Sequence, residues 1–200
     1  MKFLLGVGGV IAIVASVLIV VILIIVIIAW YIKAYNGLVA LCERVKNALS
    51  QIDVQLQKRF DLIPNLVETV KGYTKLEQGV WERFADARAG YTKARDAGDV
   101  DGMSKAASEC SSVLSRLMVV SEQYPELKAD KHYSQLMVDL KDIEKQVGYS
   151  RQFYNDTVNI YNNKVQMFPS SIVANAKGFQ VAKYFEIQHE EQREAPKVQF

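Results

Sequence analysis

The start of the chain is strongly apolar, and the rest mixes apolar and polar positions. Residues 3–32 contain no charged side chain and consist mostly of valine, isoleucine and leucine. A helix over this stretch would be roughly 45 Å long, which exceeds the ~30 Å hydrocarbon thickness of a bilayer. The pattern therefore predicts a transmembrane helix over residues 3–32 and makes the lipid bilayer the first expected partner.

The end of this stretch has the composition of an interfacial anchor. Aromatic residues and a cation cluster there, as they do where membrane helices reach water: Trp30, Tyr31, Lys33 and Tyr35. A signal peptide would have an apolar region of only about 7–15 residues and a small-residue cleavage site. We therefore expect an uncleaved, single-pass anchor.

The lysines and arginines near the membrane helix predict its orientation. Lys2 precedes the helix, whereas Lys33, Arg44 and Lys46 follow it. Because positive charge favours the cytoplasmic side, the N-terminus is expected outside and the bulk of the chain in the cytoplasm, at the bacterial inner membrane.

Beyond the membrane helix, apolar residues recur at intervals of three and four, as on one face of a helix. Four such stripes run over residues 38–63, 66–91, 103–120 and 133–165. Short loops between long amphipathic helices predict an all-α fold, an antiparallel four-helix bundle with long helices, over residues 33–185. We expect Asp130 to cap the fourth helix, and Ser170 or Ser171 to cap a short helix that Gly178 ends.

Pro64 interrupts the first two stripes and lies among polar residues. Proline removes a helical hydrogen bond, so a kink or break is expected there, with Asp61 or Asn65 capping the new start.

Polar residues also lie within the fourth stripe. Together they predict a structural hydrogen-bonded network, with a ligand pocket as the alternative; its members are Arg59, Asp61, Asn65, Arg151, Asn155 and Asn162.

Two further features favour contacts beyond one bundle. Gly8, Ala12 and Ser16 recur every four residues, and small residues let membrane helices approach closely, so self-association is expected.

Residues 186–200 form a polar tail with an apolar tip. We expect Val198 and Phe200 to dock on a bundle, although the composition of residues 186–194 alone indicates disorder.

Charge and composition exclude several function classes. The chain has 24 basic and 22 acidic residues, so no basic surface for nucleic acid is indicated. Two cysteines and two histidines do not form the clusters that metal sites need. No catalytic residues, metal ligands or cofactor sites are predicted, and a non-enzymatic protein is expected.

Several separated motifs resemble one bacterial family. Residues 59–67 read RFDLIPNLV, Tyr154-Asn155 and Tyr161-Asn162 are followed by Phe168-Pro169-Ser170, and the chain closes with APKVQF. In this order they resemble the LemA family, from about Tyr35 to Phe200. The resemblance implies one N-terminal membrane helix and a four-helix bundle, and no known enzymatic activity.

Three functions are compatible with these features. The first is an oligomeric scaffold at the inner face of the membrane. The second is an adaptor that presents its bundle to another membrane protein, such as a protease or transporter. The third, a membrane-shaping coat, would need a basic amphipathic surface helix, which the charge balance does not clearly supply.

Overall fold

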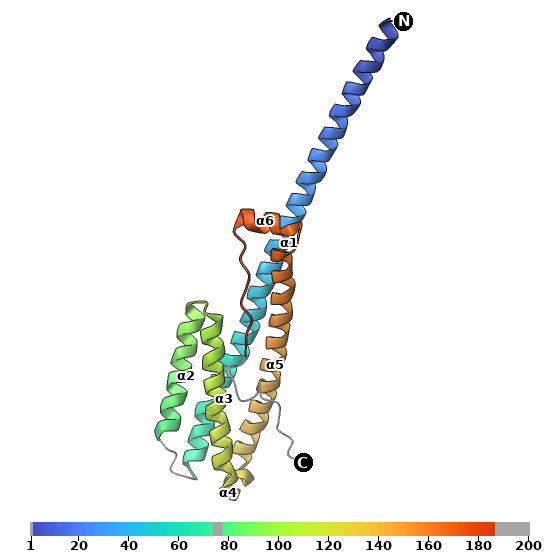
Figure 1. Cartoon of the computed structure of the whole chain (residues 1–200). Coiled ribbons are helices and arrows are strands. Elements are labelled where there is room, and N and C mark those ends of the chain that lie inside the picture. The colour runs from blue at the N-terminus through green and yellow to red at the C-terminus, as the bar shows by residue number, and fades with distance from the viewer. Residues whose placement is uncertain (1, 74–77, 187–200) are drawn as a thin grey trace, which may run out of the picture. The chain divides into compact units, whose positions relative to one another are not determined.

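A computed structural model describes residues 2–73 and 78–186 of the chain, and every regular element in these ranges is a helix (Figure 1). The all-α class and the long apolar N-terminal helix are therefore confirmed. The helices are α1 (Lys2–Lys71), α2 (Gln78–Asp96), α3 (Val100–Glu122), α4 (Pro125–Ala129), α5 (Lys131–Gln166) and α6 (Ser170–Lys177).

Helix α1 continues from the apolar stretch into the amphipathic one without interruption at Gly37. It is the one helix in the described residues that is long and apolar enough to cross a membrane. The side chains of residues 13–29 are all exposed, although nearly all are large and apolar. Such a surface in water would be unfavourable, which agrees with a lipid environment.

A break at Pro64 is wrong, because α1 continues through it to Lys71, whereas a kink within the continuous helix stays a prediction. Packing outweighs the lost hydrogen bond here. The neighbouring apolar residues on either side are almost completely buried, and their burial holds the helical path: Phe60, Ile63, Leu66 and Val67. No new helix start exists for Asp61 or Asn65 to cap.

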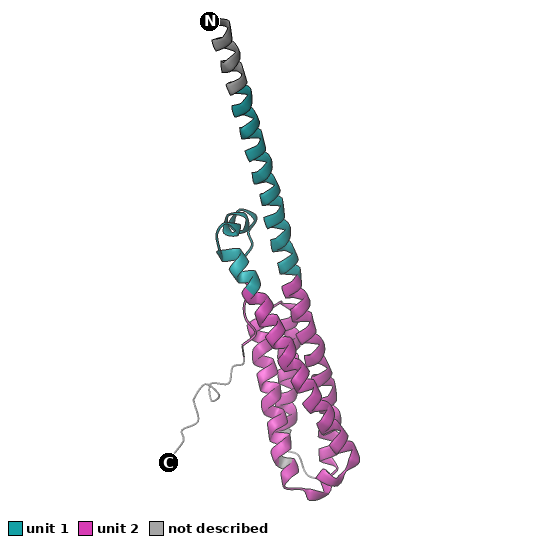
Figure 2. Cartoon of the chain, turned by 90° about the vertical axis from the view of Figure 1, so that its right-hand side faces the viewer, with its two compact units in different colours: residues 1–43, 160–181 teal, residues 44–159, 182–200 magenta. Residues whose placement is uncertain are grey.

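The chain divides into two compact units (Figure 2). Unit 1 comprises residues 1–43 and 160–181, and unit 2 comprises residues 44–159 and 182–200. In unit 1, the buried apolar residues come from α1, the end of α5 and α6: Ala34, Leu38, Tyr161, Val165, Val173 and Ala174.

The interior of unit 2 is built around aromatic rings from α1 and α2. The Phe60 ring lies 5.1 Å from the Tyr91 ring and 6.1 Å from the Phe84 ring, measured between centroids. Tyr91 is fully buried, and its hydroxyl donates a 2.8 Å hydrogen bond to Asp53. Burial raises the pKa of the Tyr91 hydroxyl, with the hydrogen bond to Asp53 acting in the same direction.

The connections in unit 2 follow the turn chemistry of the sequence. Helices α2 and α3 are joined by residues 97–99, where Gly98 adopts a φ of 66° that favours glycine. Asp130 accepts hydrogen bonds from the backbone N–H groups of His132 and Tyr133, at 2.7 and 3.0 Å. It therefore caps α5 as expected.

The short helix α6 ends as predicted but starts differently. Gly178 has a φ of 72° and its N–H bonds the α6 carbonyls, so it is the C-cap. Neither Ser170 nor Ser171 caps the start, because both lie inside α6 and Pro169 holds the N-cap position without a side-chain hydrogen bond. The Ser170 hydroxyl donates backward to the carbonyls of Lys164 and Met167, at 2.7 and 3.0 Å. This bonding ties the start of α6 to the end of α5.

Pro64→Ala should raise the free energy of unfolding by about 1–3 kcal/mol, because alanine restores the helical N–H that proline lacks. The measurement is chemical unfolding of the detergent-solubilised chain, followed by circular dichroism. Asn65→Ala, at the exposed neighbouring position, is the control and should change stability by less than about 0.7 kcal/mol. A destabilised Pro64→Ala variant would show that packing of the proline ring matters more than the missing bond.

Candidate functional site

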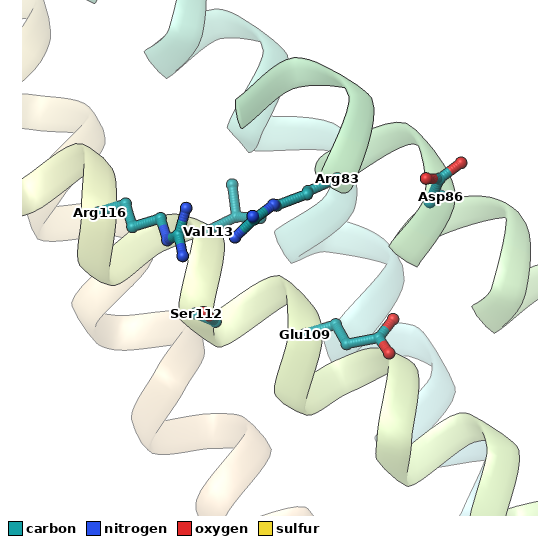
Figure 3. Close-up of a pocket in the computed structure, with 6 residues that line it drawn as sticks. All are labelled: Arg83, Asp86, Glu109, Ser112, Val113 and Arg116. Atoms are coloured by element: carbon teal, nitrogen blue, oxygen red, sulfur yellow. The ribbon is translucent and has the colours of Figure 1, made fainter. Parts of the chain in front are cut away.

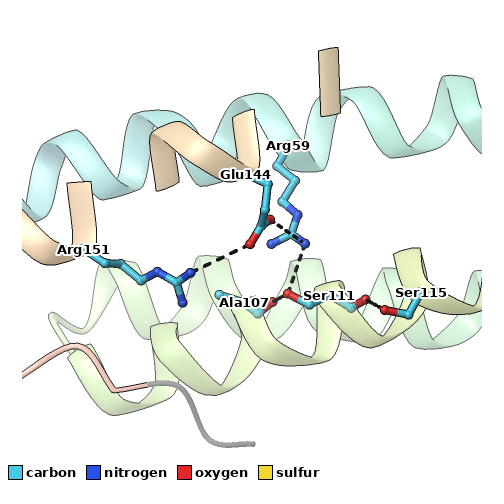
Figure 4. Close-up of polar contacts among 6 residues, drawn as sticks. All are labelled: Arg59, Ala107, Ser111, Ser115, Glu144 and Arg151. Atoms are coloured by element: carbon cyan, nitrogen blue, oxygen red, sulfur yellow. Dashed lines mark hydrogen bonds and ion pairs between the residues drawn. The ribbon is translucent and has the colours of Figure 1, made fainter. Parts of the chain in front are cut away.

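The most developed polar cluster lies inside unit 2 around Arg59, which is only 5% exposed. One guanidinium nitrogen of Arg59 lies 3.0 Å from a Glu144 carboxylate oxygen and 3.0 Å from the Ser111 hydroxyl. The other oxygen of Glu144 lies 3.8 Å from Arg151 (Figure 4). One carboxylate therefore bridges two arginines, and the cluster joins α1, α3 and α5.

Serines on α3 complete this cluster. The Ser111 hydroxyl accepts from Arg59 and donates to the Ala107 carbonyl at 3.1 Å, and Ser115 donates to the Ser111 carbonyl at 3.0 Å (Figure 4). No buried side-chain nitrogen or oxygen in the described residues lacks a hydrogen-bond partner. The pairing of these groups agrees with a structural network that holds helices in register, and the Glu144 side chain remains 48% exposed.

The other expected members of the network are not all in this cluster. Asp61 pairs with Arg88 on α2 at 2.9 Å, on an exposed surface. Asn65 is exposed, and its backbone carbonyl accepts a hydrogen bond from Thr69 at 2.9 Å. The sequence grouped these residues because they are close along the chain, whereas the helix turns them to different faces.

Asn155 binds a later part of the chain. Its carboxamide nitrogen donates to the Phe185 carbonyl at 3.2 Å, and its oxygen accepts from the Phe185 N–H at 2.9 Å. The hydroxyl of Tyr154 donates to the Lys183 carbonyl at 2.8 Å. Burial raises the pKa of Tyr154 to about 12, so its hydroxyl remains a donor.

These bonds fix residues 182–186, which we call the docked segment. Its Phe185 side chain is buried in unit 2. Ser104 on α3 donates to the Glu186 carbonyl, and Lys183 pairs with Asp101 at the start of α3. The expected docking of Val198 and Phe200 concerns residues outside the described ranges and stays a prediction.

Unit 1 contains the expected interfacial residues. Trp30 and Tyr31 are partly exposed, and Lys33 is exposed. The Tyr35 ring lies 6.1 Å from the Phe179 ring, and the Lys177 ammonium lies 5.9 Å from the same tyrosine ring. The aromatic end of the apolar helix is therefore in contact with the last residue of α6 and with Phe179, which follows it.

Two further expectations fall on unit 1. Asn162 is buried and has a polar partner, so it is not isolated. Ser16 donates to the Ile13 carbonyl at 2.8 Å within α1, and its side chain is exposed. The side chains of Gly8 and Ala12 lie outside the described part of the structure, so the helix-packing face stays a prediction.

A second polar site is a surface groove of about 350 Å³ between α2 and α3 in unit 2. Arg83 and Arg116 approach each other at one end, and Asp86 and Glu109 lie toward the other end (Figure 3). Ser112 and Val113 complete the lining. The groove therefore carries positive charge at one end and negative charge at the other, an arrangement that suits a partner with the opposite order.

No group of three or more histidine, cysteine or acidic residues in the described ranges could hold a metal ion. Cys110 is fully buried beside the Arg59 cluster, and burial raises the pKa of its thiol to about 11. A protonated, enclosed thiol is a poor nucleophile.

Sequence reasoning missed Glu144, Arg83 and Arg116. Glu144 stands among lysines and other acids in the sequence, a pattern typical of a solvated helix face, so the sequence does not mark it as the partner of Arg59. A signal was present, because Arg59 follows Leu56 by three residues and precedes Ile63 by four, within the apolar stripe. A charge at such a position needs an opposite charge nearby, and Glu144 follows Leu140 by four residues in the fourth stripe.

Comparison with known proteins adds a family match. The model of the LemA family matches residues 48–200. The chain is 26% identical to magnetosome protein MamQ 2 of Paramagnetospirillum magneticum over 182 residues, which cover 80% of this chain and 67% of that protein. It is 24% identical to magnetosome protein MamQ of Magnetospirillum gryphiswaldense over 181 residues, covering 79% and 66%. It is 25% identical to Protein LemA of Metamycoplasma hominis over 146 residues, covering 72% and 65%.

Glu144→Gln should lower the free energy of unfolding by about 1.5–3 kcal/mol, because it leaves the buried Arg59 charge without its carboxylate. Urea unfolding of the solubilised chain measures this. The matched control is Asp142→Asn, which removes an exposed pair with Lys145 on the same helix and should have little effect. Equal effects of the two substitutions would show that the Arg59 charge is satisfied without Glu144.

Asn155→Ala should release the docked segment, because it removes both hydrogen bonds to the Phe185 backbone. We expect hydrogen exchange of residues 182–186 to accelerate at least tenfold, measured by mass spectrometry, with exchange in α2 unchanged. Gln152→Ala, at an exposed position on the same helix, is the control. Unchanged exchange in Asn155→Ala would mean that Phe185 burial alone holds the segment.

Proposed function

The chain belongs to the LemA family, and from that premise we propose that it is a non-enzymatic, membrane-anchored scaffold that assembles with copies of itself. In this proposal α1 spans the inner membrane of a bacterium with the N-terminus outside. The cytoplasmic part is an antiparallel four-helix bundle with long helices, and bundles associate side by side.

The charge order of the α2–α3 groove carries this proposal. Arg83 and Arg116 form its basic end, and Asp86 and Glu109 form its acidic end. A second copy related by a two-fold axis would put its acidic end against the first copy's basic end, and the reverse contact would form at the same time. The surface is thus complementary to itself, which favours a homo-oligomer.

A second contact is needed for an assembly larger than a dimer. Gly8, Ala12 and Ser16 could supply it by packing membrane helices closely. Exposed apolar side chains on unit 2, such as Val54 and Tyr149, add surface for neighbours.

The relatives and the interior of the protein support a role without catalysis. Two of the relatives carry the name of a cellular structure, the magnetosome, and not of a reaction. The polar groups of the Arg59 cluster serve each other, and Cys110 is enclosed. The adaptor function is the alternative, in which the same bundle faces another membrane protein.

The intact chain in mild detergent should elute as a large homo-oligomer, measured by light scattering on a sizing column. Reversing the basic end (Arg83→Glu with Arg116→Glu) should reduce the mass, as should reversing the acidic end (Asp86→Arg with Glu109→Arg), because each makes the groove repel its copy. Mixing the two variants should restore the larger mass, since their grooves are again complementary.

Two other results would contradict parts of the proposal. An intact chain that runs as a small species would contradict the scaffold and favour the adaptor. A large species insensitive to both reversals would exclude the groove; Gly8→Leu, which prevents close approach of membrane helices, would then test the other contact.

A further inference from the structure

The turn between α5 and α6 exposes a compact set of apolar side chains. We define the α5–α6 corner as residues 167–172. Within it, Met167, Phe168 and Ile172 are 63%, 80% and 55% exposed. Single exposed apolar residues are common on soluble proteins, but three within six residues of sequence concentrate apolar surface at this turn.

The other side of α6 faces protein. Val173 and Ala174 are fully buried in unit 1, next in sequence to the exposed Ile172. Ser170 is also buried, and its hydroxyl ties α6 to the end of α5. The helix is therefore held in position by one face while it presents apolar side chains on another.

Contacts within unit 1 set the level of α6 along α1. Lys177, the last residue of α6, and Phe179, just beyond its C-cap, both contact the ring of Tyr35. Tyr35 comes three residues after Ile32, the last residue of the charge-free stretch, which is roughly 4.5 Å along a helix. Figure 1 shows α6 running across the direction of α1 at this level. Amphipathic helices that lie on a membrane bury their apolar face roughly 5–10 Å into the boundary between headgroups and acyl chains. Because α6 contacts α1 just beyond the end of the charge-free stretch, we place α6 at the level of the lipid headgroups.

The charges around the corner suit a membrane surface. Residues 160–181 contain Lys164 and Lys177 and no aspartate or glutamate. Lys33 adds a third cation at the end of the apolar stretch. Exposed lysines beside apolar side chains are typical of segments that bind anionic headgroups while their apolar groups reach the acyl boundary.

We propose that the α5–α6 corner inserts into the surface of the same membrane that α1 spans. Phe168, Met167 and Ile172 enter the boundary between headgroups and acyl chains, and Lys164 and Lys177 bind anionic headgroups. The protein then holds the bilayer at two places, through a spanning helix and a surface contact. This proposal rests on the membrane anchor of the proposed function and is independent of self-association.

Tryptophan quenching by brominated lipids tests the insertion in the full chain. The chain is reconstituted into phosphatidylcholine–phosphatidylglycerol vesicles with bromine near the headgroup end of the acyl chains. A variant with Trp30→Phe, Trp81→Phe and Phe168→Trp carries one fluorophore, at the corner. Its emission should be quenched at least twofold, and more weakly in vesicles of phosphatidylcholine alone.

Two single-tryptophan proteins serve as controls. One keeps Trp30 as its only tryptophan and should be quenched, since that residue belongs to the membrane helix. The other carries Tyr149→Trp, at a position 66% exposed and 19 residues before Phe168 in the sequence, and should not be quenched. Circular dichroism should show the same helix content in all three.

Each result bears on the proposal. Quenching of Trp30 without quenching at position 168 overturns the inserted corner and leaves the anchor intact. Equal quenching at positions 149 and 168 also overturns it, because the contact would not be specific to the corner. Absence of quenching at Trp30 overturns the anchor and, with it, this proposal. The role of the lysines is tested by adding Lys164→Gln and Lys177→Gln to the protein with tryptophan at position 168. If quenching in anionic vesicles is then unchanged, the lysines do not bind headgroups.

Discussion

A buried positive charge is the constraint on which unit 2 depends. Arg59 is carried on α1 between apolar residues, so its guanidinium is directed into the interior where a lone charge would be very unfavourable. Ser111 on α3 and Glu144 on α5, the latter with a side chain that is 48% exposed, each approach this guanidinium to 3.0 Å. Apolar packing alone would tolerate a shift of one helix past another, but a guanidinium with two directed partners does not. The cluster therefore selects one register among many that would bury similar apolar area.

The helices were predictable because their signals are local and repeated. Apolar spacing defined the helical segments, Asp130 marked the start of α5, and Gly178 marked the end of α6. No break occurs at Pro64 because burial of the flanking apolar residues outweighs the local effect of proline. The residues flanking it contribute more by packing than the proline removes in hydrogen bonding.

The sites were harder to predict because they depend on which helix faces meet. The sequence identified Arg59, Arg151 and Asn155 as notable, but it could not pair them with Glu144 or with the backbone of Phe185. The groove was missed for a related reason. Arg83 and Arg116 look like ordinary surface charges along the chain, and their convergence appears only when α2 and α3 are side by side.

The docked segment has a consequence for the order of folding. Helices α2 and α3 are joined by three residues, so their contacts can form as soon as both have been synthesised. Lys183 and Asp101, in contrast, are 82 positions apart in sequence. The site for the docked segment is built from α3 and α5, so it exists only after those helices have associated. Among the described residues, this segment is the last to leave the ribosome and the last able to find its place, and its docking completes a structure that the earlier helices have already formed.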